Sequence, residues 1–401
     1  MSGGGPSAEF LLLAACCRWP TDATAIREAG QTAIDWRRFV KLAQRHRVQG
    51  FARIGLEAAA IAVPPGLVAA HHRQIARNLL LLDEAGSIAT MLADADIPAL
   101  FLKGATLAEL AYGDQAVKQT LDNDLLIAPG HVAATIKLLD AIGYRVTDPA
   151  VPLDRKRLSV LIDMVKECTL VRTGNKAMLD LHWRMTSVRG LLAEPDLTRD
   201  LRMVTVGDHR LPTLGDEALM VYLAVHGARH GWSRLKWLVD FNALLARRDK
   251  AAVVALRARA KRDGVTRAMD LALLQANRVF GTAVPDDVGR SRRVRWLAAL
   301  SDTLMRGPDE LAEQRMAPWR YMAAGHASAA LLKSSPTYLA NVAWSSWVST
   351  ADALALPLPR AARPLYLLTS PAARIARAVR RMVDRGFSRT ARSPMRARQE
   401  N

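Results

Sequence analysis

Hydrophobic positions recur at helical spacing over the first ninety residues and again beyond residue 213. In the N-terminal part the clearest segments are residues 9–18, 36–45, 50–60 and 68–93. In the C-terminal part they are residues 217–230, 235–247, 251–263 and 266–278. Both ends of the chain are therefore predicted to be helical.

Between these parts the pattern changes to short apolar runs separated by turn residues. Residues 98–102 are apolar and end at Lys103 and Gly104, which predicts a buried strand followed by a tight turn. The positions that follow predict a helix over 105–112, a strand over 121–127 and a helix over 131–142 that ends at Gly143.

A β-hairpin is expected next along the chain. Residues 167–172 and 177–183 flank the sequence TGNK, in which glycine and asparagine tolerate the positive φ of a tight turn. Because side chains alternate between the two faces of a strand, Asp180 and His182 share one face of the second arm. A carboxylate and an imidazole that can support it therefore stand in a strand otherwise suited to a core.

Together these elements predict an α+β fold, in which a small mixed β-sheet lies between large helical regions at both ends of the chain. With 401 residues, half of them hydrophobic, the chain has room for two or three units with buried cores. The predicted units are a helical region over 1–94, an α/β core over 95–212, a second helical region over 213–385 and a basic disordered tail over 386–401.

The charge of the chain is strongly positive and unevenly spread. There are 56 lysines and arginines against 38 acidic residues, a formal charge of +18. From Arg360 to the end, eleven arginines face two acidic residues, and residues 371–386 predict a basic amphipathic helix suited to an anionic membrane or an acidic partner. Aromatic residues make up only 5% of the chain and do not interleave with a basic groove, so no specific nucleic-acid partner is expected.

The cysteines and the lengths of the apolar runs indicate in which cellular compartment the protein is expected. Cys16, Cys17 and Cys168 lack the spacing of zinc ligands, and adjacent cysteines make a poor disulfide pair, which favours a reducing cytoplasm. No apolar run reaches about 18 residues, so no membrane-spanning segment is expected.

Asp122 and Asp124 stand one residue apart at the start of the second predicted strand. Residues two apart in a strand point to one face, and two carboxylates so close repel each other unless a cation lies between them. The alternative is that Asp122, Asn123 and Asp124 only form a turn. Asp180 favours the first interpretation, because three carboxylates on neighbouring strands can hold two divalent cations, and Mg²⁺ prefers oxygen ligands.

The turn before the first core helix is a second candidate binding element. Gly104 and Ala105 open the helix, so their backbone N–H groups can bind a phosphate, and Lys103 can add a positive charge. The alternative for Lys103 is a position on the surface, away from any phosphate. The alternative for Asp180, instead of a metal ligand, is an ion pair with Arg184.

Two histidines and two basic residues follow in the C-terminal part. His226 and His230 are four residues apart on one helix face, the spacing of some zinc sites. No glutamate follows His226 as in metalloproteases, and the glycine after each histidine favours close helix packing, so a packing or hydrogen-bonding role is preferred. For Arg234 and Lys236 a solvated basic face is preferred over contact with a triphosphate.

The motifs also carry a resemblance to a known family. The chain resembles the bacterial uncharacterised nucleotidyltransferase family, part of the DNA polymerase β-like nucleotidyltransferase superfamily, over roughly residues 10–375. The residues that carry the resemblance are Leu102-Lys103-Gly104-Ala105, Tyr112-Gly113-Asp114, Asp122-Asn123-Asp124-Leu125-Leu126, Leu179-Asp180-Leu181-His182-Trp183, and the run from His226 through Asp240.

The resemblance implies a fold, a reaction and a set of site residues. It implies a small mixed sheet with flanking helices, two magnesium ions, and transfer of a nucleoside monophosphate from a nucleoside triphosphate (NTP) to a small-molecule, sugar or peptide acceptor. By position, Asp122 and Asp124 match the metal-binding pair, and Asp180 matches the third carboxylate, a metal ligand or general base.

Two departures from the pattern of the superfamily matter. Relatives usually have Gly-Gly or Gly-Ser at the phosphate turn, whereas this chain has Gly104 and Ala105, with Thr106 one place later. Relatives also carry an arginine shortly before the paired aspartates, where this chain has Lys118, which lacks the bidentate fork of arginine. These departures leave open the alternative of a non-catalytic nucleotide-binding or regulatory module with the same fold.

Overall fold

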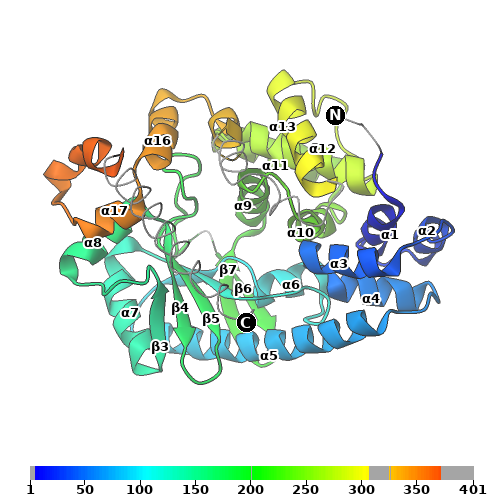
Figure 1. Ribbon diagram of the computed structural model, residues 1–401, viewed down its shortest axis with the longest axis horizontal. Helices are drawn as coiled ribbons and strands as arrows, with labels where there is room; N and C mark the ends of the chain where they lie inside the picture. Colours follow the sequence, from blue (N-terminus) through cyan, green and yellow to red (C-terminus); the bar gives the residue numbers. More distant parts are fainter. Residues whose placement is uncertain (1–4, 200, 307–324, 326, 372–401) are drawn as a thin grey trace, which may run out of the picture.

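A computed structural model describes residues 5–199, 201–306, 325 and 327–371 (Figure 1). Within them a five-stranded mixed sheet has the strand order β1-β2-β5-β4-β3, and a separate hairpin is formed by β6 and β7. The strands are β1 (Ala99–Phe101), β2 (Asn123–Ile127), β3 (Tyr144–Asp148), β4 (Glu167–Arg172), β5 (Met178–His182), β6 (Leu201–Val206) and β7 (His209–Leu214). With large helical regions at both ends, the predicted α+β fold is confirmed.

The directions of the strands place the carboxylates at the middle of the sheet. β2 runs antiparallel to β1 but parallel to β5, and β5 forms the predicted hairpin with β4. Every residue of β2 is buried, because strands pack on both of its edges and helices cover both faces. Side chains at the start of β2 therefore stand beside those of β5.

The long helix α5 (Pro65–Asp94) runs along one side of the molecule, below the sheet and the N-terminal helices in Figure 1. Its buried polar side chains hold the loop that precedes β2. Asn78 donates from Nδ2 to the carbonyl oxygens of Gln115 (2.6 Å) and Lys118 (2.7 Å), and its Oδ1 accepts from the N–H of Thr120 (3.0 Å). Because buried polar groups need such partners, α5 fixes the path of this loop toward the site.

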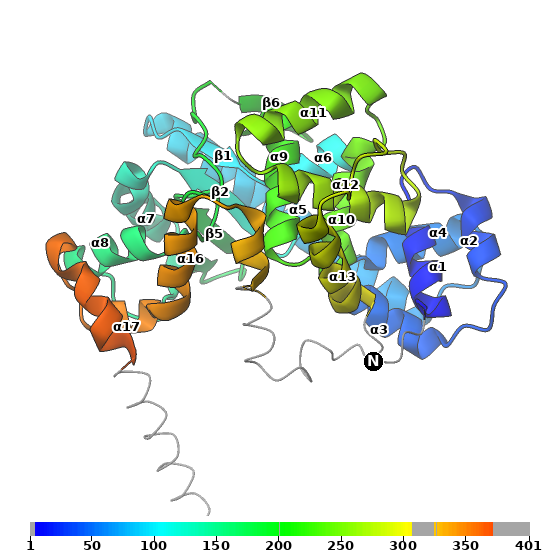
Figure 2. The ribbon, with the colours of Figure 1, turned by 90° about the horizontal axis from the view of Figure 1, so that it is seen from above.

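The N-terminal helices pack against the helices that follow the hairpin β6–β7, and one apolar core joins the two sets (Figure 2). Fully buried Leu13, Leu56, Leu238 and Met269 belong to this core. The helices are α1 (Ala8–Cys16), α2 (Ala23–Ala29), α3 (Trp36–His46), α4 (Gln49–Ala58), α9 (Asp216–Arg229), α10 (Leu235–Leu245), α11 (Lys250–Arg262), α12 (Thr266–Phe280) and α13 (Arg292–Arg306).

The last described elements lie at the other end of the sheet, beside α8 (Arg155–Met164) (Figure 1). They are α16 (Pro336–Trp347), α17 (Thr350–Ala355) and the 3₁₀ helix η2 (Arg360–Leu365). Tyr366 and Ala353, both fully buried, share a core with Val160 of α8 and with residues of the sheet. These elements therefore form a wall near the start of β4.

The helices predicted from periodicity are present, and α6 (Ala105–Tyr112) and β4 have the predicted bounds. The periodicity did not predict α2, β3, α8, β6, β7 and α13, which are short or have one exposed face. The helix α7 (Val132–Ala141) starts one residue later than predicted. The basic helix predicted over 371–386 and the tail predicted over 386–401 lie, except for Pro371, outside the described residues, and the domain boundaries stay predictions.

Two further observations concern the cysteines and the membrane. Cys16, Cys17 and Cys168 are free and buried. Among the helices of the described residues, none combines the length and the apolar character needed to cross a membrane.

Candidate active site

The carboxylates predicted from the sequence meet on adjacent strands. Asp124 on β2 and Asp180 on β5 are register partners, and Asp122 lies one residue before β2, which begins at Asn123 rather than at residue 121. All three line one cavity of about 300 Å³. Asp122 therefore belongs to the turn before β2 and Asp124 to the strand, so the expectation that both stand in one strand is wrong for Asp122.

Asp124 is buried and bears two positively charged or hydrogen-bonding partners. Its Oδ1 lies 3.0 Å from Lys103 Nζ and 3.1 Å from His182 Nε2. Burial opposes the charge of this carboxyl, but Lys103 and His182 hold its pKa well below the usual range. Burial likewise opposes the charge of Lys103, and Asp124 and the nearby Tyr222 and Asp122 raise its pKa. Lys103 is therefore a charged member of the site rather than a surface residue.

His182 lies between two carboxylates. Its Nε2 contacts Asp124, and its Nδ1 lies 2.9 Å from Glu167 Oε2, while Lys166 pairs with the same oxygen of Glu167. Burial and Lys166 oppose protonation, but the hydrogen bonds to Asp124 and Glu167 raise the pKa of His182. The ring therefore orients Asp124, whereas the sequence led us to expect that it supports Asp180.

The pKa values of Asp180 and Asp122 are raised, whereas that of Asp124 is lowered. Burial raises the pKa of Asp180 to about 6, with Asp122 and Asp124 adding to the shift and a hydrogen bond from Thr169 (2.6 Å) opposing it. Burial and the negative charge of Asp124 also raise the pKa of Asp122. Asp180 accepts a hydrogen bond from Thr169 and makes no ion pair with Arg184, the partner considered from the sequence, and it lines the cavity.

The donor set fits a divalent cation. Ligand atoms of Asp124, Asp180 and His182 all lie within 4.8 Å of one another. Both ring nitrogens of His182 already contact carboxylates, so the oxygens of the aspartates are the better ligands. Such oxygens suit Mg²⁺, and a cation among them would relieve the repulsion that raises the pKa of Asp180. Asp122 is outside this group but lines the same cavity.

The predicted phosphate turn is present at the edge of the cavity. Gly104 lies immediately before α6, with φ 73° and ψ −133°, a conformation that glycine adopts far more readily than other residues. Ala105 begins the helix, so N–H groups of its first turn have no partner within the helix. The hydroxyl of Thr106, one place after the usual position, donates to the carbonyl oxygens of Lys103 (3.2 Å) and Phe101 (3.4 Å), so its proton is already used within the turn.

Two further lysines, Lys118 and Lys236, line the cavity. Lys118 Nζ lies 3.5 Å from Asp240 Oδ2, and Tyr112 donates to the other oxygen of Asp240 (2.7 Å). Lys236 also lines the cavity, which corrects the preference for a solvated face. Burial, together with Lys118 and other nearby cations, lowers the pKa of Lys236 to about 7. Arg234 is not among the residues that line the cavity.

His226 and His230 close the cavity with an aromatic surface. Their ring centroids are 4.6 Å apart, and His230 stacks on Trp237 at 4.7 Å. Burial lowers the pKa of His230 to about 3 and that of His226 well below its ordinary value, and Lys103 adds to both shifts. Within the described residues no group of candidate metal ligands includes them, and the contacts support the packing role that the sequence favours.

Several lining residues were not identified from the sequence. Glu167, Lys166 and Ser187 belong to no motif identified from the sequence, although Glu167 is the register partner of His182 across the hairpin. The alternating pattern of the hairpin could have identified Glu167, because cross-strand partners share a face. Trp237 lies in the run from His226 through Asp240 that carries the family resemblance, but no role was assigned to it.

Comparison with known proteins identifies the family of the chain. A sequence model of the family described as "Uncharacterised nucleotidyltransferase" matches residues 32–281, which is more than half of the chain but less than the expected span of 10–375. The matched residues include every aspartate and lysine of the cavity. A search among curated proteins found no match.

Proposed function

The chain belongs to the uncharacterised nucleotidyltransferase family, and we propose that it transfers a nucleoside monophosphate from an NTP to an acceptor in a magnesium-dependent reaction. The observation that carries the proposal is the pairing of Asp124 with Asp180 in one cavity with the Gly104 turn. A small molecule, a sugar or a peptide with a nucleophilic hydroxyl is the proposed acceptor.

The residues divide into two groups around the substrate. Asp122, Asp124 and Asp180 are the proposed ligands of Mg²⁺, which when bound supplies charge neutralisation and Lewis-acid activation at the phosphates. The helix N-terminus after Gly104 and the nearby lysines are the proposed triphosphate contacts, because N–H dipoles and ammonium groups stabilise phosphate charge. His182 keeps the carboxylate of Asp124 in place.

In the proposed step the acceptor oxygen forms a bond to the α-phosphorus. The bond between that phosphorus and the oxygen leading to the β-phosphate breaks, and pyrophosphate leaves with the electron pair. Asp180 takes the proton of the acceptor hydroxyl, a role for which its place beside Asp124 in the cavity suits it.

Calorimetric titration with each of the four NTPs tests the proposal. We expect an NTP to bind the wild-type protein only when Mg²⁺ is present, and the Asp122→Asn, Asp124→Asn double variant to lose that binding. A matched control is the Asp94→Asn, Asp96→Asn double variant, which makes the same change at the same spacing on exposed residues. It should bind like the wild type.

Equal binding by the site variant and the wild type, both well folded, contradicts the proposal. Binding that depends on metal and aspartates but gives no transfer across a broad panel of acceptors leaves the non-catalytic nucleotide-binding module as the better description. The same panel, with an NTP labelled at the α-phosphate, identifies the acceptor when transfer occurs.

A further inference from the structure

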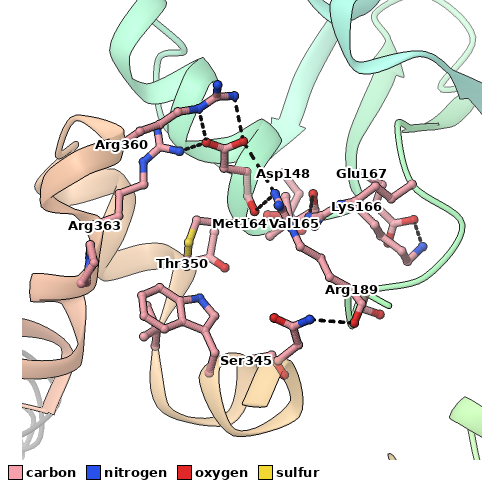
Figure 3. Close-up of a pocket in the computed structure, with 17 residues that line it drawn as sticks. Asp148, Met164, Val165, Lys166, Glu167, Arg189, Ser345, Thr350, Arg360 and Arg363 are labelled. Atoms are coloured by element: carbon pink, nitrogen blue, oxygen red, sulfur yellow. Dashed lines mark hydrogen bonds and ion pairs between the residues drawn. The ribbon is translucent and has the colours of Figure 1, made fainter. Parts of the chain in front are cut away.

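A second, larger cavity adjoins the catalytic one on the side of the last described helices (Figure 3). Its volume is about 910 Å³, against about 300 Å³ for the catalytic cavity. Its walls come from the end of α8, the start of β4, the segment after β5, and the elements α16, α17 and η2. Lys166, Glu167 and Ser187 line both cavities, so the two meet at these residues.

Arginines dominate the charge of this space, which we call the arginine cavity. Lys166 pairs with Glu167, so their charges offset each other. The remaining charged side chains are four arginines and two carboxylates: Arg184, Arg189, Arg360 and Arg363 against Asp148 and Asp163. The wall therefore carries an excess of positive charge.

Asp163 is the point where three of the arginines converge. Arg360 makes two contacts with its carboxylate, of 2.9 and 3.2 Å, Arg363 pairs with it, and Arg189 lies at 3.6 Å. In Figure 3, Arg360 and Arg363 lie on the opposite side of the cavity from Lys166 and Glu167. One carboxylate neutralises only one guanidinium, so this cluster suits a further anion with oxygen acceptors.

Arg184 adds a buried guanidinium with incomplete hydrogen bonding. Its exposed fraction is 8%, one of its terminal nitrogens donates to the carbonyl oxygen of Val165, and its Nε has no hydrogen-bond partner among the described residues. Burial lowers its pKa to about 10, Arg189 adds to the shift, and Glu194 opposes it. A buried donor of this kind is stabilised when an oxyanion reaches it.

We propose that the arginine cavity binds the acceptor and that this acceptor carries a carboxylate or phosphate group. The inference rests on the proposed function, since it assigns the second substrate of that reaction. The acceptor's anionic group contacts the arginines, and Trp344 and Val348 contact its non-ionic part. Its hydroxyl extends past Ser187, which lines both cavities, and reaches Asp180 in the catalytic cavity.

The charges of the two cavities support this division between substrates. The catalytic cavity has its own cations for a triphosphate, namely Lys103, Lys118 and Lys236, and its own turn at Gly104. The arginines are thus not needed for the nucleotide, and they disfavour a polycationic acceptor by like-charge repulsion.

Calorimetry with the catalytic cavity filled tests the proposal. The full chain is saturated with Mg²⁺ and an α,β-methylene NTP, whose α-phosphate cannot be transferred, and is then titrated with inorganic phosphate or one of three four-carbon probes. Succinate carries two negative charges, putrescine two positive charges, and 1,4-butanediol none. We expect binding of phosphate or succinate and none of the other two. The comparison of phosphate with succinate distinguishes the two kinds of anionic group.

Variants assign the anion to the arginine cavity. In the Arg189→Gln, Arg360→Gln double variant, which changes side chains that are more than half exposed, anion binding should weaken at least about tenfold while NTP affinity stays within about twofold. The control is the Arg199→Gln, Arg210→Gln double variant, which removes the same charge from exposed positions outside both cavities and should bind like the wild type.

Three outcomes of the anion titrations overturn the proposal. They are absence of anion binding, preference for putrescine or 1,4-butanediol, and equal anion binding by the wild type and the arginine variant. A loss of NTP affinity in the arginine variant also overturns it, because the cavity then holds the nucleotide. If the wild type binds no NTP, the proposed function fails separately, and the same titrations without nucleotide decide whether the arginine cavity is an anion site.

Discussion

Asp124 and Asp180 lie directly opposite each other on the parallel strands β2 and β5, although the strands β3 and β4 lie between them in the sequence. The pairing fixes which way both side chains point, because a shift of one residue in either strand would turn one carboxylate to the other face of the sheet. The two carboxyls differ in pKa, because burial raises the pKa of Asp180, whereas Lys103 and His182 lower that of Asp124.

The first prediction separates the roles of the two carboxyls. Asp180→Asn should keep metal-dependent NTP binding, because Asp122 and Asp124 remain, but should lower the rate of nucleotide transfer by about 10² to 10⁴, the usual contribution of a general base. The two measurements are calorimetric NTP affinity and transfer of label from the α-phosphate. Asp94→Asn is the control at an exposed position. Full transfer activity in Asp180→Asn would remove Asp180 from the mechanism.

The second prediction concerns the phosphate turn. An added Cβ at Gly104 meets no atom closer than 3.6 Å, so Gly104→Ala tests backbone strain rather than a clash. At φ 73° and ψ −133° the alanine should lower the free energy of unfolding by about 1–3 kcal/mol, and the shifted N–H groups should weaken NTP binding. Urea unfolding and calorimetry measure the two effects.

Gly130→Ala provides the comparison for this variant, since Gly130 has open space around its Cβ position and no positive φ. It should leave NTP affinity unchanged. If Gly104→Ala binds NTP as tightly as Gly130→Ala does, the turn is not a phosphate site, whatever its effect on stability.

The third prediction is that NTP binding takes up a proton at Lys236. With a pKa of about 7, this lysine is about three-quarters neutral at pH 7.5, and a bound triphosphate favours its charged form. Binding should therefore take up close to that fraction of a proton at pH 7.5 and less as the pH falls below 7. The slope of binding enthalpy against buffer ionisation enthalpy measures the uptake.

Two substitutions identify the group that takes up this proton. Lys236→Arg should bind NTP without the uptake, because arginine is already protonated, and Lys236→Met should lose both affinity and uptake. Unchanged proton uptake in Lys236→Arg would assign it to another group, and the lowered pKa of Lys236 would then have no part in binding.

Local patterns predicted the elements that carry the aspartates. The alternation around Asp180, the glycine turn at Gly104 and the spacing of Asp122 and Asp124 are contained within short segments, so periodicity and turn chemistry were sufficient. The resemblance to the family then placed these segments in one site. The order of the strands, with β5 inserted between β2 and β4, follows from tertiary packing and was not readable from the pattern.

The rest of the site depends on contacts between distant segments. Lys236 belongs to a helix whose pattern also fits a solvated face, and only the packing of α10 against α6 turns it into the cavity. The arginine cavity brings Arg184, which follows β5, together with Arg360 from η2. No local rule predicts that such separate residues meet, because their proximity results from the burial of many apolar side chains.

The last prediction concerns the dependence of stability on pH. His46 of α3 is fully buried, and its Nδ1 accepts a hydrogen bond from the N–H of Leu235 at the start of α10 (3.1 Å). Burial lowers its pKa well below 6.5, and Arg45 and Arg234 add to the shift. Below pH 6.5 the unfolded chain therefore binds a proton here that the folded chain does not, so the free energy of unfolding falls as the pH falls.

His46→Asn should remove this contribution, because asparagine keeps a hydrogen-bond acceptor but does not titrate. Between pH 7.5 and pH 5.5 its free energy of unfolding should fall by about 1.4 kcal/mol less than that of the wild type, measured by urea unfolding at the two pH values. His72→Asn, at an exposed position of α5, should keep the slope of the wild type. Equal slopes in the wild type and His46→Asn would mean that His46 is protonated in the folded protein, and the contact between α3 and α10 would then need an anionic partner at this ring.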